Sequence, residues 1–216
     1  DVSLFMFTKD GILLDNAYSQ RIFDGEPEDQ VVADAYQHMD LDRPLAPIMA
    51  LNELEAVDFF YPVIHGNLGE DGTIQGLFKL LKKPYVGSGI SASALSFDKD
   101  LTKKMLNEAG IRNTPYVLLT PENQAEYSWG RLEEELGNLI FIKPARQGSS
   151  VGIHRVTNAE EYAAALKDAF KYDFKVLAEK GLDRPQEIEI SILGNEHPVA
   201  SKLGAVRVPE SDPFYD

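Results

Sequence analysis

The segment FIKPARQGSSVGIHRV, residues 141–156, consists of two apolar runs separated by a polar tip rich in glycine and serine. Apolar runs of this length bounded by turn residues predict two strands joined as a hairpin. Backbone N–H groups in such a tip can point at one anion, serine hydroxyls add donors, and Lys143 at the end of the first run adds a full charge. The segment therefore predicts a phosphate-binding flap, for which the alternative is an exposed hairpin turn. A Walker A loop is excluded, because a strand rather than a helix follows the tip.

The residues on both sides of this hairpin favour an α+β fold with an antiparallel sheet. Upstream, we expect a helix with Pro121 in its first turn and Gly137 at its end. Downstream, Thr157 and Glu160 have the spacing of a capping box at the start of a helix, and the strand KVLAE follows that helix. In EIEISILG, residues 187–194, the alternation predicts a strand with its isoleucines on one face and its glutamates on the other.

The first part of the chain has a different rhythm. VDFFYPVIH, residues 57–65, is almost continuously apolar, which predicts a strand buried on both faces in a parallel sheet. A glycine-rich loop, a helix over residues 73–82 and the short strand of PYVGSG follow, and this order is typical of an α/β domain. The next helix, in SFDKDLTKKMLNEAG, is expected to begin at a cap supplied by Ser96 or Asp98. We therefore place a domain boundary near residue 97.

Three further positions are candidates for ligand binding. The loop HGNLGEDG begins at His65, which can hold a carboxylate or orient a neighbour; the alternative is a hydrogen-bonded histidine in a turn. Lys99 and Lys103 lie four residues apart and share one helix face, for which a solvated surface is the alternative. Glu187 is able to accept two ribose hydroxyls beside an apolar slot, against the alternative of a strand edge with solvated charges.

The composition is that of an acidic globular protein. The 216 residues carry a formal net charge of −14, which disfavours binding to nucleic-acid phosphates. Cysteine is absent, so disulfide and thiolate chemistry are excluded, and no apolar run reaches the roughly 18 residues of a membrane span. Local spacing predicts no metal site. The opening DVSLFMFTKDG reads like the interior of a domain and DPFYD lacks a closing element, so both ends look cut.

Five motifs together resemble one family: HGNLGEDGTIQG, PYVGSG, SFDKDLTKKML, FIKPARQGSSVGI and EIEISILGN occur in the order found in D-alanine–D-alanine ligases and their D-alanine–D-lactate relatives. These enzymes belong to the ATP-grasp superfamily, and the resemblance covers nearly the whole chain. It implies an α/β N-terminal domain with a Rossmann-like parallel sheet (residues 1–97), followed by an α+β ATP-grasp domain with antiparallel sheets. That second domain would comprise a central subdomain (98–182) and the incomplete start of a C-terminal subdomain (183–216).

The resemblance also implies an activity. ATP phosphorylates the carboxylate of one D-alanine, and the amine of a second D-alanine attacks the resulting acyl phosphate, giving a dipeptide for peptidoglycan precursors. ATP and Mg²⁺ are the implied cofactors, and the metal ligands are expected beyond Asp216. A cytoplasmic homodimer is typical of the family.

Site residues follow from the family motifs, position by position. Lys99 and Lys143 match lysines that hold ATP phosphates, Ser149 matches the serine that positions substrate in the flap, and Ser150 and Val151 match its phosphate-covering neighbours. His65 matches the histidine near the first D-alanine, and Glu70 matches the glutamate that supports it. The adenine-contacting run is matched by Glu179, Lys180 and Leu182, and the ribose ligand is matched by Glu187. The interval between Glu179 and Glu187 is one residue longer than the usual pattern.

Three alternatives are open. The first is the D-lactate ligase, because the aromatic residue that usually separates it from the D-alanine ligase is expected beyond Asp216. The second is a different ATP-grasp carboxylate–amine ligase, against which HGNLGEDG argues. The third is a non-catalytic nucleotide-binding module, which predicts ATP binding without D-alanine-dependent release of ADP.

Overall fold

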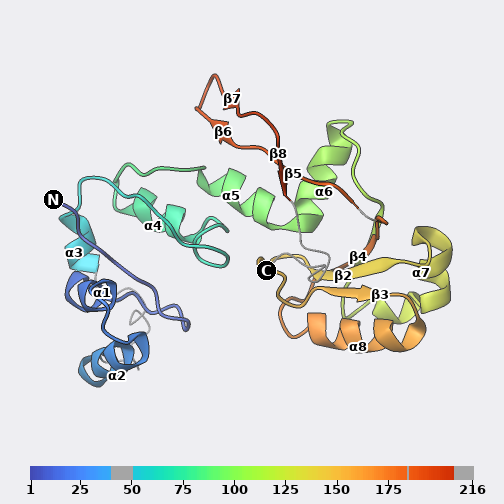
Figure 1. Cartoon of the computed structure of the whole chain (residues 1–216), viewed down its shortest axis with the longest axis horizontal. Helices are drawn as coiled ribbons and strands as arrows, with labels where there is room; N and C mark the ends of the chain where they lie inside the picture. The colour runs from blue at the N-terminus through green and yellow to red at the C-terminus, as the bar shows by residue number, and fades with distance from the viewer. Residues whose placement is uncertain (40–50, 184, 207–216) are drawn as a thin grey trace. The chain divides into compact units, whose positions relative to one another are not determined.

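A computed structural model describes residues 1–39, 51–183 and 185–206 of the chain, which divides into two compact units, Asp1–Ser96 and Phe97–Asp216. Each unit has its own hydrophobic core, and Figure 1 shows the helices and strands of each. Across these described residues, every helix falls short of the length and apolar character needed to cross a lipid bilayer.

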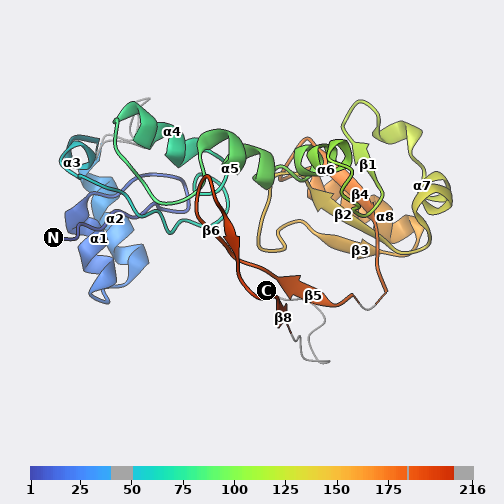
Figure 2. The same ribbon diagram turned by 90° about the horizontal axis from the view of Figure 1, so that it is seen from above.

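The first unit is mainly helical. Its helices are α1 (Asn16–Phe23), α2 (Glu28–His38), α3 (Leu51–Glu55), α4 (Thr73–Leu80) and α5 (Ile90–Phe97), the last of which ends at the boundary between the units. Helices α1 and α2 lie side by side in both views (Figures 1 and 2). The core contains Leu13, Leu54, Ile74 and a pair of stacked rings, Phe60 and Phe78, whose centroids are 4.2 Å apart.

The apolar run at residues 57–65 does not form the strand expected from the sequence. A single parallel bridge joins Phe60 to Tyr85, with Phe60 N donating to Pro84 O and Val86 N donating to Phe60 O, at 3.0 Å each. Phe60 packs into the core, but the side chains that point the other way are 53 to 72% exposed, since no described element of this unit covers them; they are Phe59, Tyr61 and Val63. The prediction of a strand buried on both faces is therefore wrong for the described residues, and the parallel sheet is not confirmed.

The second unit is built on a four-stranded antiparallel sheet, as the sequence predicts. Its strands, in spatial order, are β1 (Tyr116–Leu119), β4 (Val176–Lys180), β2 (Ile140–Pro144) and β3 (His154–Val156). Helices α7 (Trp129–Leu136) and α8 (Ala159–Ala169) share a core with the residues of one sheet face (Figure 1). Because side chains alternate along a strand, Lys143 and Glu179 lie on the other face, where Lys103 of α6 (Lys99–Glu108) pairs with Glu179.

Several helix boundaries differ from the predicted ones because side chains cap the backbone at other positions. Helix α7 begins at Trp129 after a Ser128 cap, and the segment that follows Pro121 forms turns and a 3₁₀ helix, η2 (Gln124–Glu126). Helix α8 is capped one residue later than expected, with Asn158 accepting from the N–H of Glu161. The Glu161 carboxylate reaches back to the N–H of Thr157.

Helix α4 ends at Leu80, close to its expected end, and α6 is capped by Asp98, one of the two predicted caps. Helix α5 was not expected, because its sequence ISASALSF mixes small polar and apolar residues without a strong period.

The predicted strand in residues 187–194 is divided into two short strands. Strand β5 (Glu187–Glu189) pairs with β8 (Gly204–Val206), and β6 (Ile192–Leu193) pairs with β7 (Val199–Ala200). The isoleucines of this segment are 46 to 61% exposed, so they do not form the buried face that the alternation suggested: Ile188, Ile190 and Ile192. Residues 207–216, including the closing DPFYD, lie outside the described residues.

Candidate functional site

Helix α6 places Lys99 at the base of the β2–β3 hairpin. The Asp98 carboxylate caps the helix by accepting from the backbone N–H groups of the next turn, at 3.1 Å each, so Lys99 is the first helical residue. Its backbone N–H donates to Ala145 O at 2.9 Å. Its ammonium donates to Pro144 O at 3.3 Å and to Gln147 O at 2.5 Å. Lys99 is therefore fixed against the residues where the hairpin tip begins.

Lys143, at the end of β2, belongs to a cluster of charges on the same sheet face. Its Nζ atom lies 3.2 Å from Glu179 Oε2 in β4, and the Nζ atom of Lys103 in α6 lies 3.3 Å from Glu179 Oε1. The hydroxyl of Thr114 donates to the same carboxylate. A single glutamate thus lies between two ammonium groups that come from different elements.

The electrostatics of this cluster favour an anionic ligand. Burial, and next the nearby ammonium of Lys143, lower the pKa of Lys99. Burial would raise the pKa of Glu179, but Lys143, the Thr114 hydroxyl and Lys103 outweigh it and the pKa is lowered. An anion arriving between Lys99 and Lys143 would relieve the repulsion between them, because opposite charges stabilise the protonated form of a lysine.

The hairpin tip is a strained turn. Val151 N donates to Gly148 O at 3.1 Å, and Ser149 and Ser150 have φ of 47° and 57°. Positive φ at both central residues is the pattern of a type I′ turn, which normally carries Asn-Gly or another glycine-containing pair. Serine in this conformation is costly, and such strain concentrates at functional sites. Ser149, Ser150 and Val151 are all exposed, as expected of a flap that contacts a ligand.

The first unit holds the second group of candidates in the loop after residue 64. His65 Nδ1 lies 3.9 Å from Glu70 Oε1, and the other oxygen of Glu70 accepts from Gly66 N at 2.8 Å. The structure thus brings these two predicted residues together, with 83% and 50% of their side chains exposed. The loop is tight at Gly69, where an added Cβ would lie 2.1 Å from Ile64 O, so only glycine fits there without a shift.

The remaining predicted residues do not join these groups. Lys180 follows Glu179 in β4, so its side chain points to the opposite sheet face, where it is exposed. Leu182 is 54% exposed. Glu187 lies at the exposed start of β5 and makes no polar contact with the lysine cluster among the described residues. Their matches to the adenine-contacting and ribose-binding positions stay predictions.

Sequence reasoning missed the structural role of Lys103. Its side chain is 10% exposed, and its ammonium donates to Thr114 O at 2.9 Å and lies 5.2 Å from the centre of the Tyr116 ring. The solvated helix face taken as the alternative for this residue is therefore wrong. Its spacing of four residues from Lys99 was the available signal, because both side chains then lie on the same helix face.

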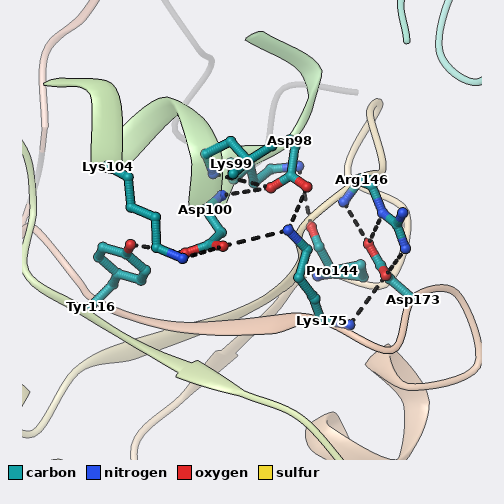
Figure 3. Close-up of polar contacts among 10 residues, drawn as sticks. Asp98, Lys99, Asp100, Lys104, Tyr116, Pro144, Arg146, Asp173 and Lys175 are labelled. Atoms are coloured by element: carbon teal, nitrogen blue, oxygen red, sulfur yellow. Dashed lines mark hydrogen bonds and ion pairs between the residues drawn. The ribbon is translucent and has the colours of Figure 1, made fainter. Parts of the chain in front are cut away.

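A second set of charges, which the sequence analysis did not identify, lies at the start of α6, on either side of Lys99 in the chain. Lys175, just before β4, places its ammonium 2.5 Å from Asp98 Oδ2 and 3.4 Å from Asp100 Oδ2 (Figure 3). Tyr116 donates to the other oxygen of Asp100 at 3.0 Å. Burial, followed by the hydrogen bond to Asp100, raises the pKa of Tyr116 to about 12. This network joins the start of α6 to the sheet and so holds Lys99 in place.

Within residues 1–39, 51–183 and 185–206, no group of three His, Asp or Glu side chains has the arrangement of a metal site. What this part of the chain does offer is cations and backbone donors for an anion.

Comparisons with known proteins show which family the chain resembles. Residues 1–88 match the family model described as D-ala D-ala ligase N-terminus, and residues 105–216 match the one described as D-ala D-ala ligase C-terminus. The chain is 80% identical to a D-alanine–D-alanine ligase of Limosilactobacillus reuteri over 216 residues, all of this chain and 57% of that relative. It therefore spans little more than half the length of this curated relative.

Two solved structures have the same fold. The D-alanine–D-alanine ligase from Coxiella burnetii superposes with a TM-score of 0.71 at 33% identity, over 90% of this chain and 57% of that one. The VanG D-Ala:D-Ser ligase from Enterococcus faecalis superposes with a TM-score of 0.70 at 27% identity, over 95% and 60% of the respective chains.

Proposed function

Because the chain belongs to the D-alanine–D-alanine ligase family, we propose that the whole protein uses ATP to join two molecules of D-alanine. One observation in the structure supports the proposal: the Lys99 ammonium is bonded to the start of a serine–glycine hairpin whose first strand ends at Lys143, and the charge of Lys143 is near enough to lower the pKa of Lys99. Two cations beside a set of backbone donors are what a triphosphate tail requires.

The proposed reaction has two steps. A carboxylate oxygen of the first D-alanine attacks the terminal phosphorus of ATP, and the bond to ADP breaks. The amine of the second D-alanine, after losing a proton, then attacks the carbonyl carbon of the acyl phosphate, and phosphate leaves with the electrons of the C–O bond. ATP supplies the phosphoryl group that converts a poor leaving group into a good one.

In this scheme the residues of this chain bind, orient and exclude water. Lys99 and Lys143 neutralise phosphate charge, and Ser149, Ser150 and Val151 cover the phosphates when the flap closes. In the other unit, His65 would hold the first D-alanine, and Glu70 keeps the histidine in place. Glu179, Lys180 and Leu182 are proposed to contact the adenine, and Glu187 the ribose.

A bound Mg²⁺ would supply further positive charge to neutralise the phosphates. Among the described residues no group of three His, Asp or Glu side chains has the arrangement of a metal site, and we assign the ion to no side chain of this chain. We further propose a cytoplasmic homodimer, which is typical of the family.

The decisive experiment measures ADP release by the whole protein with ATP, Mg²⁺ and D-alanine. Lys143→Ala should lower the rate by about 10²- to 10³-fold, because a developing phosphate charge would be left uncompensated. The matched control is Lys171→Ala, which removes an equally charged side chain that is 65% exposed and paired with Asp168. Equal rates in wild type and Lys143→Ala would exclude the assigned role of Lys143.

The same assay separates the alternatives. A nucleotide-binding module would bind ATP but release no ADP in response to D-alanine. Competition among D-alanine, D-lactate and D-serine as second substrates, followed by product analysis across pH, identifies the nucleophile. An amine is inactivated by protonation as the pH falls, whereas a hydroxyl is not, so a depsipeptide product that dominates at low pH would favour the D-lactate alternative.

A further inference from the structure

Asp173 binds the residue at which the flap begins. Its carboxylate accepts from Arg146 N at 2.9 Å, from Arg146 Nε at 3.1 Å and from Arg146 Nη2 at 2.7 Å (Figure 3). It also accepts from Lys175 N at 3.1 Å, and its side chain is only 1% exposed. The guanidinium of Arg146 in turn lies 4.8 Å from the centre of the Phe174 ring. A buried carboxylate with four donors holds its partners in one geometry.

The other end of the flap rests on the same loop. Gly152 has φ of 68°, and an added Cβ would lie 2.7 Å from the ring of Tyr172 and 2.8 Å from Pro144 Cγ. Gln147 also donates from its side chain to Tyr172 O, at 3.5 Å. Residues 172–174, between α8 and β4, therefore support both the first and the last residue of the flap, which we define as residues 146–152.

The strand that leads into the flap is fixed as well. Ala145 donates to Lys175 O and accepts from Lys99 N, at 2.9 Å each. The tip residues 148–151, by contrast, are held by turn hydrogen bonds of their own. The flap is thus a short tip, closed by its own turn hydrogen bonds, on an anchored base, and Asp173 is the charged part of that anchor.

We propose that Asp173 is a positioning residue that sets how the flap closes over the phosphates. The inference rests on the proposed function and extends it, because Asp173 would touch neither substrate nor nucleotide. Without its carboxylate, Arg146 loses its side-chain partner and the flap base can take other orientations. Only a fraction of the molecules then has a flap in the binding-competent orientation. The apparent Kd for ATP rises to the intrinsic Kd divided by that fraction.

A poorly seated flap also admits water to the acyl phosphate. Water then attacks the acyl phosphate in place of the second D-alanine, phosphate leaves, and the first D-alanine is regenerated. ATP is consumed without dipeptide, so the ratio of ADP released to dipeptide formed exceeds one. A purely structural loss of folded enzyme would lower both products equally and leave this ratio unchanged.

The test uses the whole protein with Asp173→Asn and Arg146→Ala, and with Arg131→Ala as control. Arg131 is matched to Arg146, because it pairs with a carboxylate at 3.1 Å and lies 4.2 Å from a tyrosine ring, but it is on α7. We expect the first two variants to raise KM for ATP about tenfold and to release more ADP than dipeptide, while the control behaves like wild type. Arg146→Lys should fall between Arg146→Ala and wild type.

An unchanged product ratio and an unchanged KM in folded Asp173→Asn would overturn the proposal, and so would an equal loss of both products. If Asp173→Asn does not fold, Arg146→Lys decides, since it keeps a positive charge beside the buried Asp173 carboxylate and the Arg146 side chain is 43% exposed. Amide hydrogen exchange over residues 147–151, measured without nucleotide, should accelerate in both variants. This arm needs no activity, so it tests the anchor even if wild type fails to release ADP and the proposed function falls.

Discussion

Replacing Glu179 with glutamine removes the only carboxylate that lies between the ammonium groups of Lys103 and Lys143 among the described residues. The two N···O distances are 3.3 and 3.2 Å, and 13% of the Glu179 side chain is exposed. Glutamine has nearly the same shape and can still accept from the Thr114 hydroxyl, so the change isolates the loss of charge. The result would be two partly buried cations facing an uncharged amide.

The cost follows from these distances. At an effective dielectric constant of about 20, a pair at this separation attracts by roughly 5 kcal/mol before desolvation is counted. Breaking a buried pair by removing one partner costs about 3–5 kcal/mol. Because 24% of the Lys143 side chain is exposed and solvent screens part of the charge, we expect a loss near the lower end, about 3 kcal/mol.

The assay is urea unfolding of the whole protein, with Glu135→Gln as control. Glu135 is likewise a paired carboxylate, here with Arg131, but 43% of its side chain is exposed, so losing its charge should cost at most about 0.5 kcal/mol of unfolding free energy. A double-mutant cycle with Lys103→Met should recover a coupling of about 1–3 kcal/mol, since the two residues are in contact. A loss below about 0.5 kcal/mol in Glu179→Gln, equal to the control, would refute the reasoning that this carboxylate is needed to hold the lysines together.

Three further outcomes are expected. Gly69→Ala should lower the unfolding free energy measured in urea by about 1–3 kcal/mol, because the new Cβ would lie 2.1 Å from a backbone carbonyl oxygen. The control Gly76→Ala has open space in α4 and should raise the unfolding free energy by up to about 1 kcal/mol. Similar values for the two variants would contradict the geometry. Burial and a neighbouring carboxylate raise the pKa of Tyr116 to about 12, so its contribution to stability is complete below about pH 10 and is lost as the pH rises through 12; Tyr116→Phe should remove part of the late phenol ionisation in an ultraviolet titration, and an unchanged late phase would contradict this. Burial opposes ionisation of Asp173, but the hydrogen bonds from Arg146 lower its pKa, so its contribution is present above about pH 4 and is lost as the pH falls through the lowered value; the difference in unfolding free energy between wild type and Asp173→Asn should shrink as the pH falls below about 4, and a difference that grows in acid would contradict this.

Local signals in the sequence predicted the second unit well. Two apolar runs and a glycine–serine turn are enough to predict the hairpin of β2 and β3, because its antiparallel pairing joins residues that are close in the sequence. The Asp98 cap is likewise a matter of a few neighbouring residues. The start of α7 was placed too early because Pro121 is compatible with a turn as well as with a first helical turn, and Asn123 settles the choice by accepting from Thr120 N.

The apolar run at residues 57–65 shows where such signals fail. Continuous hydrophobicity indicates burial but does not say which elements supply the cover. In the described first unit, Phe78 of α4 stacks on Phe60 and Tyr85 bridges to it, whereas the side chains of Phe59, Tyr61 and Val63, on the other side of the run, stay exposed. The same holds for the isoleucines of β5 and β6, whose alternation predicted a buried face that the described residues do not bury.

The sequence by itself determined the order of the elements, the glycine–serine tip and the candidate lysines, because each is written in a few adjacent residues. Only the tertiary structure decided which charges meet. Glu179 contacts Thr114 across 65 residues of chain, and Asp173 binds Arg146 across 27. Sequence spacing carries no information on such pairs, since they form only when the sheet brings β1, β4 and β2 together. The low dielectric constant of that interior then makes each pairing strong and each unpaired charge costly.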